Sequence, residues 1–183
     1  MIDTFRQFKN SYSFKNRGMF LEDLINKTNQ YYLDNDIAVI YKKPIPIHIV
    51  KINSNNKIIE AYFEKASTSD YNGIYKGKYI DFEAKCTTLK TSFPLSNLTE
   101  NEFNHLKRVY KHGGISFIII YFSELDEYYI YEMKNLLTYL SENKRKSIPY
   151  EEIKTNGFLI SFGLIIPLNY IEIIDLLYFN LPS

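Results

Sequence analysis

The apolar positions along the chain recur with two different spacings, and each spacing predicts one kind of element. Where apolar residues recur every three or four positions, they form one stripe of a helix. This spacing predicts helices over Asn16 to Tyr32, over Thr99 to Lys111, after Met133, and over Asn169 to Tyr178. The second helix starts with the capping-box pair Thr99 and Glu102 and stops at Gly113 and Gly114.

Short apolar or alternating runs predict the strands. The expected strands are Ile37 to Tyr41, His48 to Ile52, Ile58 to Phe63, Ile74 to Cys86 with a turn at Lys76 and Gly77, Ile115 to Phe122, and Tyr128 to Tyr131. The turn-forming stretch Asn53 to Asn56 joins the second and third runs as a hairpin. Ile115 to Phe122 is apolar throughout, which is typical of a strand covered on both faces. The stretch Ala66 to Gly73 is polar and predicts a loop.

The order of these elements predicts one α/β domain over residues 1–183, with a central sheet. One segment does not fit inside such a sheet. Lys42 to Ile47 contains Pro44 and Pro46, which neither a helix interior nor a central strand accommodates. We therefore expect an extended, exposed excursion over about residues 42–63.

The composition narrows the class of protein. It is that of an ordinary folded domain, since 45% of the residues are hydrophobic and 23% are charged. No apolar run approaches the roughly 18–20 residues of a membrane span, and the N-terminus does not look like a signal peptide, so we expect a cytoplasmic protein without membrane association. The single cysteine excludes an intramolecular disulfide and a cysteine-only zinc site, and the three histidines lack metal-ligand spacing. The net charge of +1 does not by itself predict DNA binding.

Candidate chemistry is concentrated in the stretch Tyr79 to Thr87, which reads YIDFEAKCT. Side chains alternate across a strand, so Asp81, Glu83 and Lys85 share one face and apolar residues take the other. The simplest interpretation is a half-exposed strand whose charges are solvated and form cross-strand ion pairs.

Asp70 favours a catalytic interpretation instead. If Tyr71 to Tyr75 pairs with this strand as a hairpin, Asp70 comes to the same end of the sheet as Glu83. Two carboxylates suit a hard cation such as Mg²⁺, which polarises a phosphate and lowers the pKa of its bound water. Lys85 lies about 6–7 Å along the same face and could position that water or offset transition-state charge. Glu22 on the first helix is either a further metal ligand or a solvated helix charge, and both interpretations stay open.

The pattern of an Asp followed by Glu-x-Lys resembles the catalytic pattern of restriction-endonuclease-like nucleases. Five longer blocks make the resemblance specific: NRGMFLEDLINKTNQYY, AVIYKKPIPIHIVK, AYFEKASTSDYNGIYKGKYIDFEAK, KTSFPLSN and KHGGISFIII. In this order they are similar to signature segments of the RecU family of Holliday junction resolvases. The resemblance implies a restriction-endonuclease-like fold, with a mixed central sheet flanked by helices and a projecting stalk. It also implies a homodimer shaped like a cap on a stalk.

The resemblance assigns roles to individual residues. The implied catalytic residues are Thr68, Asp70, Glu83 and Lys85, and the implied metal ligands are Asp70, Glu83, Thr68 and, as the superfamily's helix glutamate, Glu22. The metal is expected to be Mg²⁺, with Mn²⁺ as a substitute. DNA contacts are expected at Lys42, Lys43, Arg17 and Lys90, and the stalk at about residues 42–63 would enter the centre of a four-way junction.

The expected activity is that of a crossover junction endodeoxyribonuclease in recombination and repair. A two-fold junction needs two matched nicks, which a two-fold homodimer supplies from identical sites. A recombinase or a branch-migration helicase is a further candidate partner. Two alternatives stay open: a non-cutting protein that binds junctions or modulates a recombinase, and a restriction-like endonuclease specific for duplex DNA. The intact set of Asp70, Glu83 and Lys85 argues against the first, and the stalk with its prolines and basic pair argues against the second.

Two segments depart from the family pattern. The turn between His48 and Ala61 is shorter and less basic than expected, which leaves the reach of the stalk open. The stretch Glu100 to Phe103 replaces a histidine- and glutamine-bearing stretch, so an auxiliary DNA or metal contact could be lost there.

Overall fold

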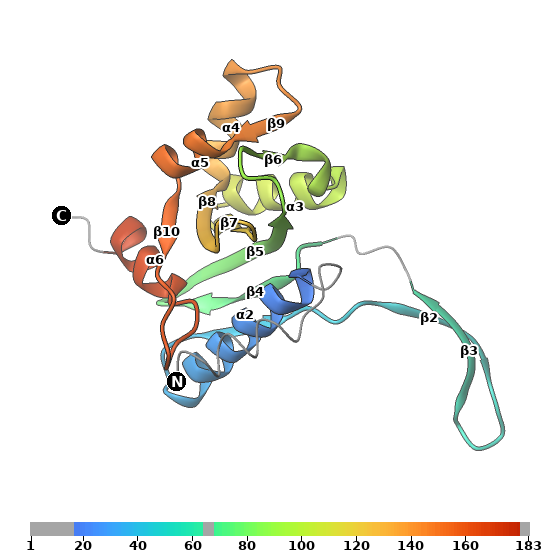
Figure 1. Ribbon diagram of the computed structural model, residues 1–183. Helices are drawn as coiled ribbons and strands as arrows, with labels where there is room; N and C mark the ends of the chain where they lie inside the picture. Colours follow the sequence, from blue (N-terminus) through green and yellow to red (C-terminus); the bar gives the residue numbers. More distant parts are fainter. Residues whose placement is uncertain (1–16, 64–67, 180–183) are drawn as a thin grey trace.

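The computed structural model describes residues 17–63 and 68–179, and its centre is a six-stranded mixed sheet (Figure 1). In sheet order the strands are β1 (Val39–Lys42), β4 (Tyr71–Tyr75), β5 (Lys78–Thr87), β7 (Ile115–Phe122), β8 (Glu127–Glu132) and β10 (Phe158–Ile160). β5 and β7 run parallel, and the other neighbouring pairs run antiparallel. The predicted mixed α/β architecture with a central sheet is confirmed.

Helices cover both faces of this sheet. They are α2 (Arg17–Asp34), α3 (Glu100–Lys111), α4 (Met133–Glu142), α5 (Tyr150–Asn156) and α6 (Tyr170–Tyr178), with a 3₁₀ turn η2 (Leu95–Asn97) before α3. β7 is buried along its whole length, because Phe117 belongs to the core under α2 and α6 while Ile118 belongs to the core under α3 and α4. This confirms the strand covered on both faces. None of the helices described is long and apolar enough to cross a membrane.

A separate hairpin projects from the sheet, as the two prolines predict (Figure 1). It consists of β2 (Ile47–Ile52) and β3 (Ile58–Phe63), and every residue of both strands is exposed. Its turn is closed by Asn53, whose side-chain oxygen accepts hydrogen bonds from the backbone N–H groups of Asn55 and Lys57, both at 2.9 Å.

The structure also differs from the sequence prediction in several short elements. β4 begins at Tyr71, as the hairpin expected of Tyr71 to Tyr75 requires, so the loop predicted to run to Gly73 ends before Tyr71. The Tyr71 ring stacks on Phe82 at 4.9 Å between centroids. The strands β6 (Ser92–Pro94), β9 (Ser147–Pro149) and β10 were not predicted. A strand of three residues is too short to show an alternating pattern, so only the pairing with a distant strand defines it.

Candidate active site

The hairpin of β4 and β5 brings Asp70 next to Glu83. Its turn has a left-handed backbone at Lys76 and Gly77, with φ of 45° and 76°, as a tight two-residue hairpin turn requires. The register pairs Tyr71 with Phe82, so the residues that follow in this register are Asp70 and Glu83. One carboxylate oxygen of Asp70 accepts a hydrogen bond from the backbone N–H of Ala84 at 3.1 Å. The convergence expected from the sequence is therefore present.

Glu83 is a fully buried carboxylate without hydrogen bonds. Neither of its oxygens has a hydrogen-bond partner in the part of the chain that the structure describes. Lys85 Nζ lies 3.1 Å from Oε2, which makes an ion pair but not a hydrogen bond. Burial and the neighbouring Asp70 carboxylate together raise the pKa of Glu83 to about 9. A buried acid in this state is costly unless further positive charge or a donor is supplied.

The donor set fits a hard divalent cation. Asp70 and Glu83 offer adjacent carboxylates, and such a cation takes one or two carboxylates together with hydroxyl, water and phosphate oxygens. Residues 17–63 and 68–179 contain no group of three or more histidine, cysteine, aspartate and glutamate side chains that could hold a metal. Two protein carboxylates completed by water and substrate are the coordination expected of Mg²⁺ rather than of zinc.

Asp70 faces a pocket of about 350 Å³ at the base of the hairpin. Its walls include Glu22 from α2, Thr68, Asp70 and the segment 42–46. Three of the four expected metal ligands therefore line one pocket, Glu22 from α2 and Thr68 and Asp70 from the segment before β4. Glu22 is also paired with Lys42, whose Nζ lies 2.5 Å from Oε2 of Glu22. Glu83 lies outside the lining of this pocket.

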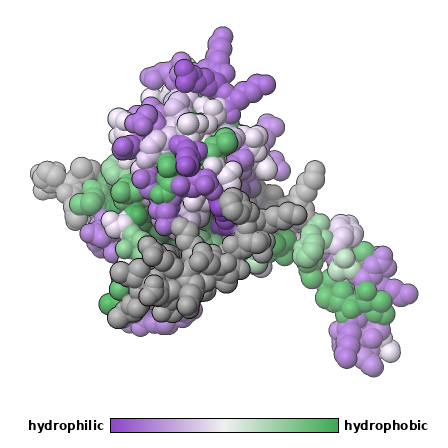
Figure 2. Space-filling view, viewed as in Figure 1, coloured by the Kyte–Doolittle hydropathy of each residue, from purple (hydrophilic) through white to green (hydrophobic). Residues whose placement is uncertain are grey.

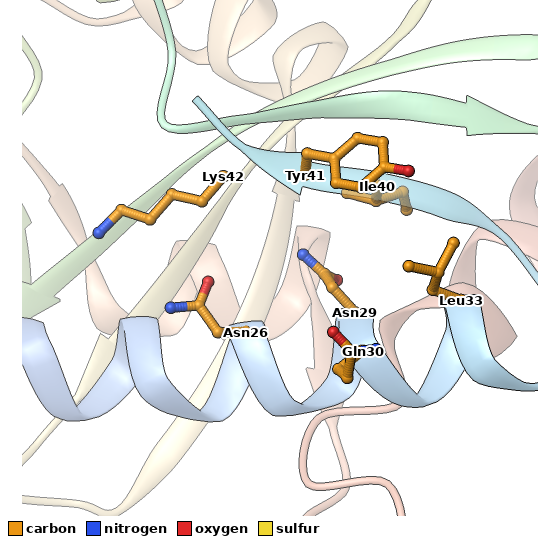
Figure 3. A pocket seen from close by; sticks show the side chains of 7 residues that line it. All are labelled: Asn26, Asn29, Gln30, Leu33, Ile40, Tyr41 and Lys42. Carbon is orange, nitrogen blue, oxygen red and sulfur yellow. The ribbon is translucent and has the colours of Figure 1, made fainter. Parts of the chain in front are cut away.

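A second hollow, of about 190 Å³, lies between α2 and β1 (Figure 3). Figure 3 shows Asn26, Asn29 and Gln30 of α2 facing β1. Lys42 lines both hollows, so the two are neighbours. The smaller one has no carboxylate in its lining, and its polar side chains apart from Tyr41 and Lys42 are neutral amides. Of these two hollows, the larger one has the oxygen donors that a cation needs.

Lys85 is held by Glu102, a residue that the sequence analysis left outside the site. Lys85 Nζ donates to Oε1 of Glu102 at 3.0 Å, and the other oxygen of Glu102 accepts from the backbone N–H of Thr99 at 2.7 Å. The capping box thus fixes the Glu102 carboxylate beside Lys85. Burial lowers the pKa of Lys85, but Glu83 and Glu102 outweigh it and raise the pKa above its usual value. Lys85 is therefore positively charged. Its second partner, Glu102, is brought to it by the packing of α3 on β5.

The charged face of β5 is not solvated, so the simplest interpretation of its sequence was wrong. Asp81 and Glu83 are both fully buried, because α3 packs over this face of β5 and β7. Glu83 lacks hydrogen bonds, whereas Asp81 contacts several side chains, among them Lys43 and His105.

The four expected DNA contacts lie in different surroundings. Lys42 and Lys90 are exposed. Arg17 donates to Ser123 Oγ at 2.5 Å and forms an ion pair with Glu124 at 2.6 Å. The side chain of Lys43 is only 18% exposed and is engaged with Asp81. The roles of all four residues toward DNA stay predictions.

Comparison with known proteins gives a family match over most of the chain. The chain matches the family model described as Recombination protein U, RecU, over residues 16–176. It is 46% identical over 177 residues to the Holliday junction resolvase RecU of Bacillus cereus (strain B4264), covering 93% of this chain and 88% of the relative. It is 47% identical over 176 residues to the protein of the same name from Bacillus anthracis (strain A0248), covering 92% and 88%. Among solved structures it is similar to Archaeoglobus fulgidus Hjc, a Holliday junction resolvase, with a TM-score of 0.43 and 10% identity over 74% of this chain and 94% of the other.

Proposed function

This chain belongs to the RecU family, and from this premise we propose that it is a Holliday junction resolvase that nicks four-way DNA junctions in a metal-dependent reaction. The observation that carries the chemistry is the buried carboxylate of Glu83, which lies beside Asp70, forms an ion pair with Lys85 and has no hydrogen bond in the described part of the chain. Such an arrangement is costly for the fold and is understandable if a cation completes it.

In this proposal Asp70 and Glu83 hold Mg²⁺, or Mn²⁺ as a substitute, with Thr68 and Glu22 as additional ligands. When bound, the ion polarises the scissile phosphate and lowers the pKa of the attacking water. Lys85 places its positive charge where the phosphate gains negative charge in the transition state. Glu102 keeps the ammonium group of Lys85 oriented.

The acting species that we propose is a homodimer joined through the hairpin. Figure 2 shows hydrophobic side chains gathered along the hairpin and hydrophilic ones at its far end. Eight large apolar residues of its strands are at least 43% exposed: Ile47, Ile49, Val50, Ile52, Ile58, Ile59, Tyr62 and Phe63. An isolated two-stranded ribbon is only marginally stable in water, and an apolar surface of this kind marks an interface. A two-fold dimer would give a junction two identical nuclease sites.

The whole chain would act in the cytoplasm as one nuclease domain, with the hairpin as the stalk that enters the junction. Lys42, Lys43, Arg17 and Lys90 are the proposed DNA contacts, and a recombinase or a branch-migration helicase is a further candidate partner.

The test is cleavage of a synthetic mobile four-way junction by the purified protein, with and without Mg²⁺, and a linear duplex of the same sequence as control. We expect paired symmetric nicks that require Mg²⁺ and much slower cutting of the duplex. Tight junction binding without any nicks would favour a non-cutting junction-binding protein. Equal cutting of both substrates would favour a duplex endonuclease.

A further inference from the structure

Asp81 is a fully buried carboxylate that the proposed chemistry does not use. Three side chains contact its Oδ2 atom: Tyr79 Oη at 2.7 Å, His105 Nε2 at 2.9 Å and Lys43 Nζ at 3.0 Å. Its other oxygen accepts a hydrogen bond from Ser69 Oγ. These partners come from β5, from α3, from the segment before β2 and from the segment before β4.

The two buried acids of β5 therefore differ in how many hydrogen bonds they accept. Both oxygens of Asp81 are occupied by donors, whereas Glu83, two residues further along the same face, has no hydrogen bond to any of the described residues. Lys43 supplies the counter-charge to Asp81 in a setting where neither side chain is well solvated. Because its coordination is already filled by protein groups, Asp81 is suited to hold structure rather than a metal ion.

The partners of Asp81 lie next to the proposed metal ligands. Ser69 stands between Thr68 and Asp70 in the sequence. Lys43 Nζ donates to Ser69 Oγ at 2.7 Å, and the backbone N–H of Lys43 donates to the carbonyl of Asp70 at 2.8 Å. The segment 68–70 is thus held through a side chain and through its backbone. Lys43 is also the residue at which the chain leaves β1 for the hairpin.

We propose that Asp81 is a positioning residue for the nuclease reaction. Through Lys43 and Ser69 it fixes Thr68 and Asp70 relative to Glu83, and it joins this geometry to the base of the hairpin. The inference rests on the proposed function, since it takes Asp70 and Glu83 as the metal ligands. It also gives Lys43 a role different from a phosphate contact.

The test begins with Asp81→Asn, which keeps the size of the side chain but removes the charge that balances Lys43. Residues that orient metal ligands contribute about 10–100-fold to metal affinity or activity, so we expect losses of this size in Mg²⁺ affinity, measured by calorimetry, and in junction cleavage. Lys43→Gln should cause a similar loss. The protein that carries both Asp81→Asn and Lys43→Gln should lose no more Mg²⁺ affinity than the more impaired single variant, because both changes break the same link. Junction affinity of Asp81→Asn without divalent ions should stay within about twofold of the wild type, since the Asp81 side chain is fully buried and is not among the proposed DNA contacts.

Asp175→Asn is the matched control. Asp175 on α6 also accepts hydrogen bonds from a tyrosine and a lysine, Tyr75 at 2.8 Å and Lys76 at 2.6 Å, but it lies outside the site. This variant should bind Mg²⁺ and cut junctions like the wild type. If Asp81→Asn shows no cooperative thermal transition, Ser69→Ala and Lys43→Gln are judged by the same measurements.

Several outcomes overturn the inference. One is wild-type Mg²⁺ affinity in Asp81→Asn, and another is additive losses in the double variant. A third is a Lys43→Gln protein that loses junction affinity but keeps Mg²⁺ affinity, which would return Lys43 to the role of a phosphate contact. A wild-type chain that binds Mg²⁺ and cuts no junction would refute the proposed function alone, because the calorimetric comparison does not depend on cleavage.

Discussion

At the scale of single residues, Glu83 shows how a site can work against the stability of its fold. Burial makes Glu83 costly to charge, and repulsion from the neighbouring Asp70 carboxylate adds to that cost. A core built for stability alone would give this acid a donor, as it does for Asp81. Within residues 17–63 and 68–179 Glu83 has the ion pair with Lys85 but no hydrogen bond to either oxygen, and this is the reason to expect an ion here.

This leads to a prediction for Glu83→Gln. The variant should lose junction cleavage and should also lose the increase in thermal midpoint that Mg²⁺ gives the wild type, because a ligand stabilises only the folded state that binds it. Its midpoint without metal should be at least that of the wild type, since the change removes a buried acid without hydrogen bonds. Scanning calorimetry with and without Mg²⁺ measures both quantities.

Glu151→Gln on α5 is the control for the charge change, because Glu151 is exposed and far along the sequence from the site. It should keep the response to Mg²⁺. An undiminished thermal shift in Glu83→Gln would show that the ion binds without this residue.

At the scale of elements, the hairpin of β2 and β3 leaves apolar side chains exposed on both of its strands in the single chain. Within residues 17–63 and 68–179 the extensive contacts of each hairpin strand are with the other strand, and apolar residues such as Ile49 and Ile59 are 43% and 58% exposed. We therefore expect a second molecule to cover this exposed apolar surface.

The prediction at this scale is that Ile49→Ser combined with Ile59→Ser shifts the protein from dimer to monomer in sedimentation velocity at micromolar concentration. Loss of two apolar anchors from an interface costs several kcal/mol, roughly 2–4 if both are fully buried in the dimer. Leu159→Ser on β10, where Leu159 is 55% exposed at the opposite edge of the sheet, is the matched control and should remain a dimer. A doubly substituted protein that sediments like the wild type would place the dimer contact elsewhere.

At the scale of the whole molecule, one continuous path of contacts joins the hairpin, the pocket at its base and the buried acid Asp81. The hairpin projects from the sheet edge at β1, its base lines the pocket that Asp70 faces, and Lys43 connects that base to Asp81. In a two-fold dimer this path would occur twice, so the two nicks would be made by independent sites on one bound junction.

Mixed dimers test this view. Wild-type subunits mixed with Glu83→Gln subunits should form dimers that bind a junction normally and nick one strand only, because each site would need its own Glu83. Gel analysis of a junction labelled on both continuous strands would show single nicks without separation into duplexes. Paired nicks from mixed dimers would mean that one site cuts both strands.

The sequence by itself determined the long elements and the convergence of the acids. Helix and strand periods are local properties, and so are the capping box at Thr99 and the turn at Lys76 and Gly77, so they can be predicted from neighbours in the chain. The β4 and β5 register followed from that turn, and with it the place of Asp70 beside Glu83. The two prolines likewise predicted the projecting hairpin.

Only the tertiary structure decided which charges are buried and which groups they meet. The helix α3 covers the acidic face of β5, so the acids that were expected to be solvated are buried. Both oxygens of Asp81 accept hydrogen bonds, whereas Glu83 has an ion pair with Lys85 and no hydrogen bond within the described residues. Lys43 meets an acid 38 residues away, and Lys85 meets Glu102 at the start of the next helix. Burial and long-range partners depend on how elements pack, and a local pattern of residues does not contain that information.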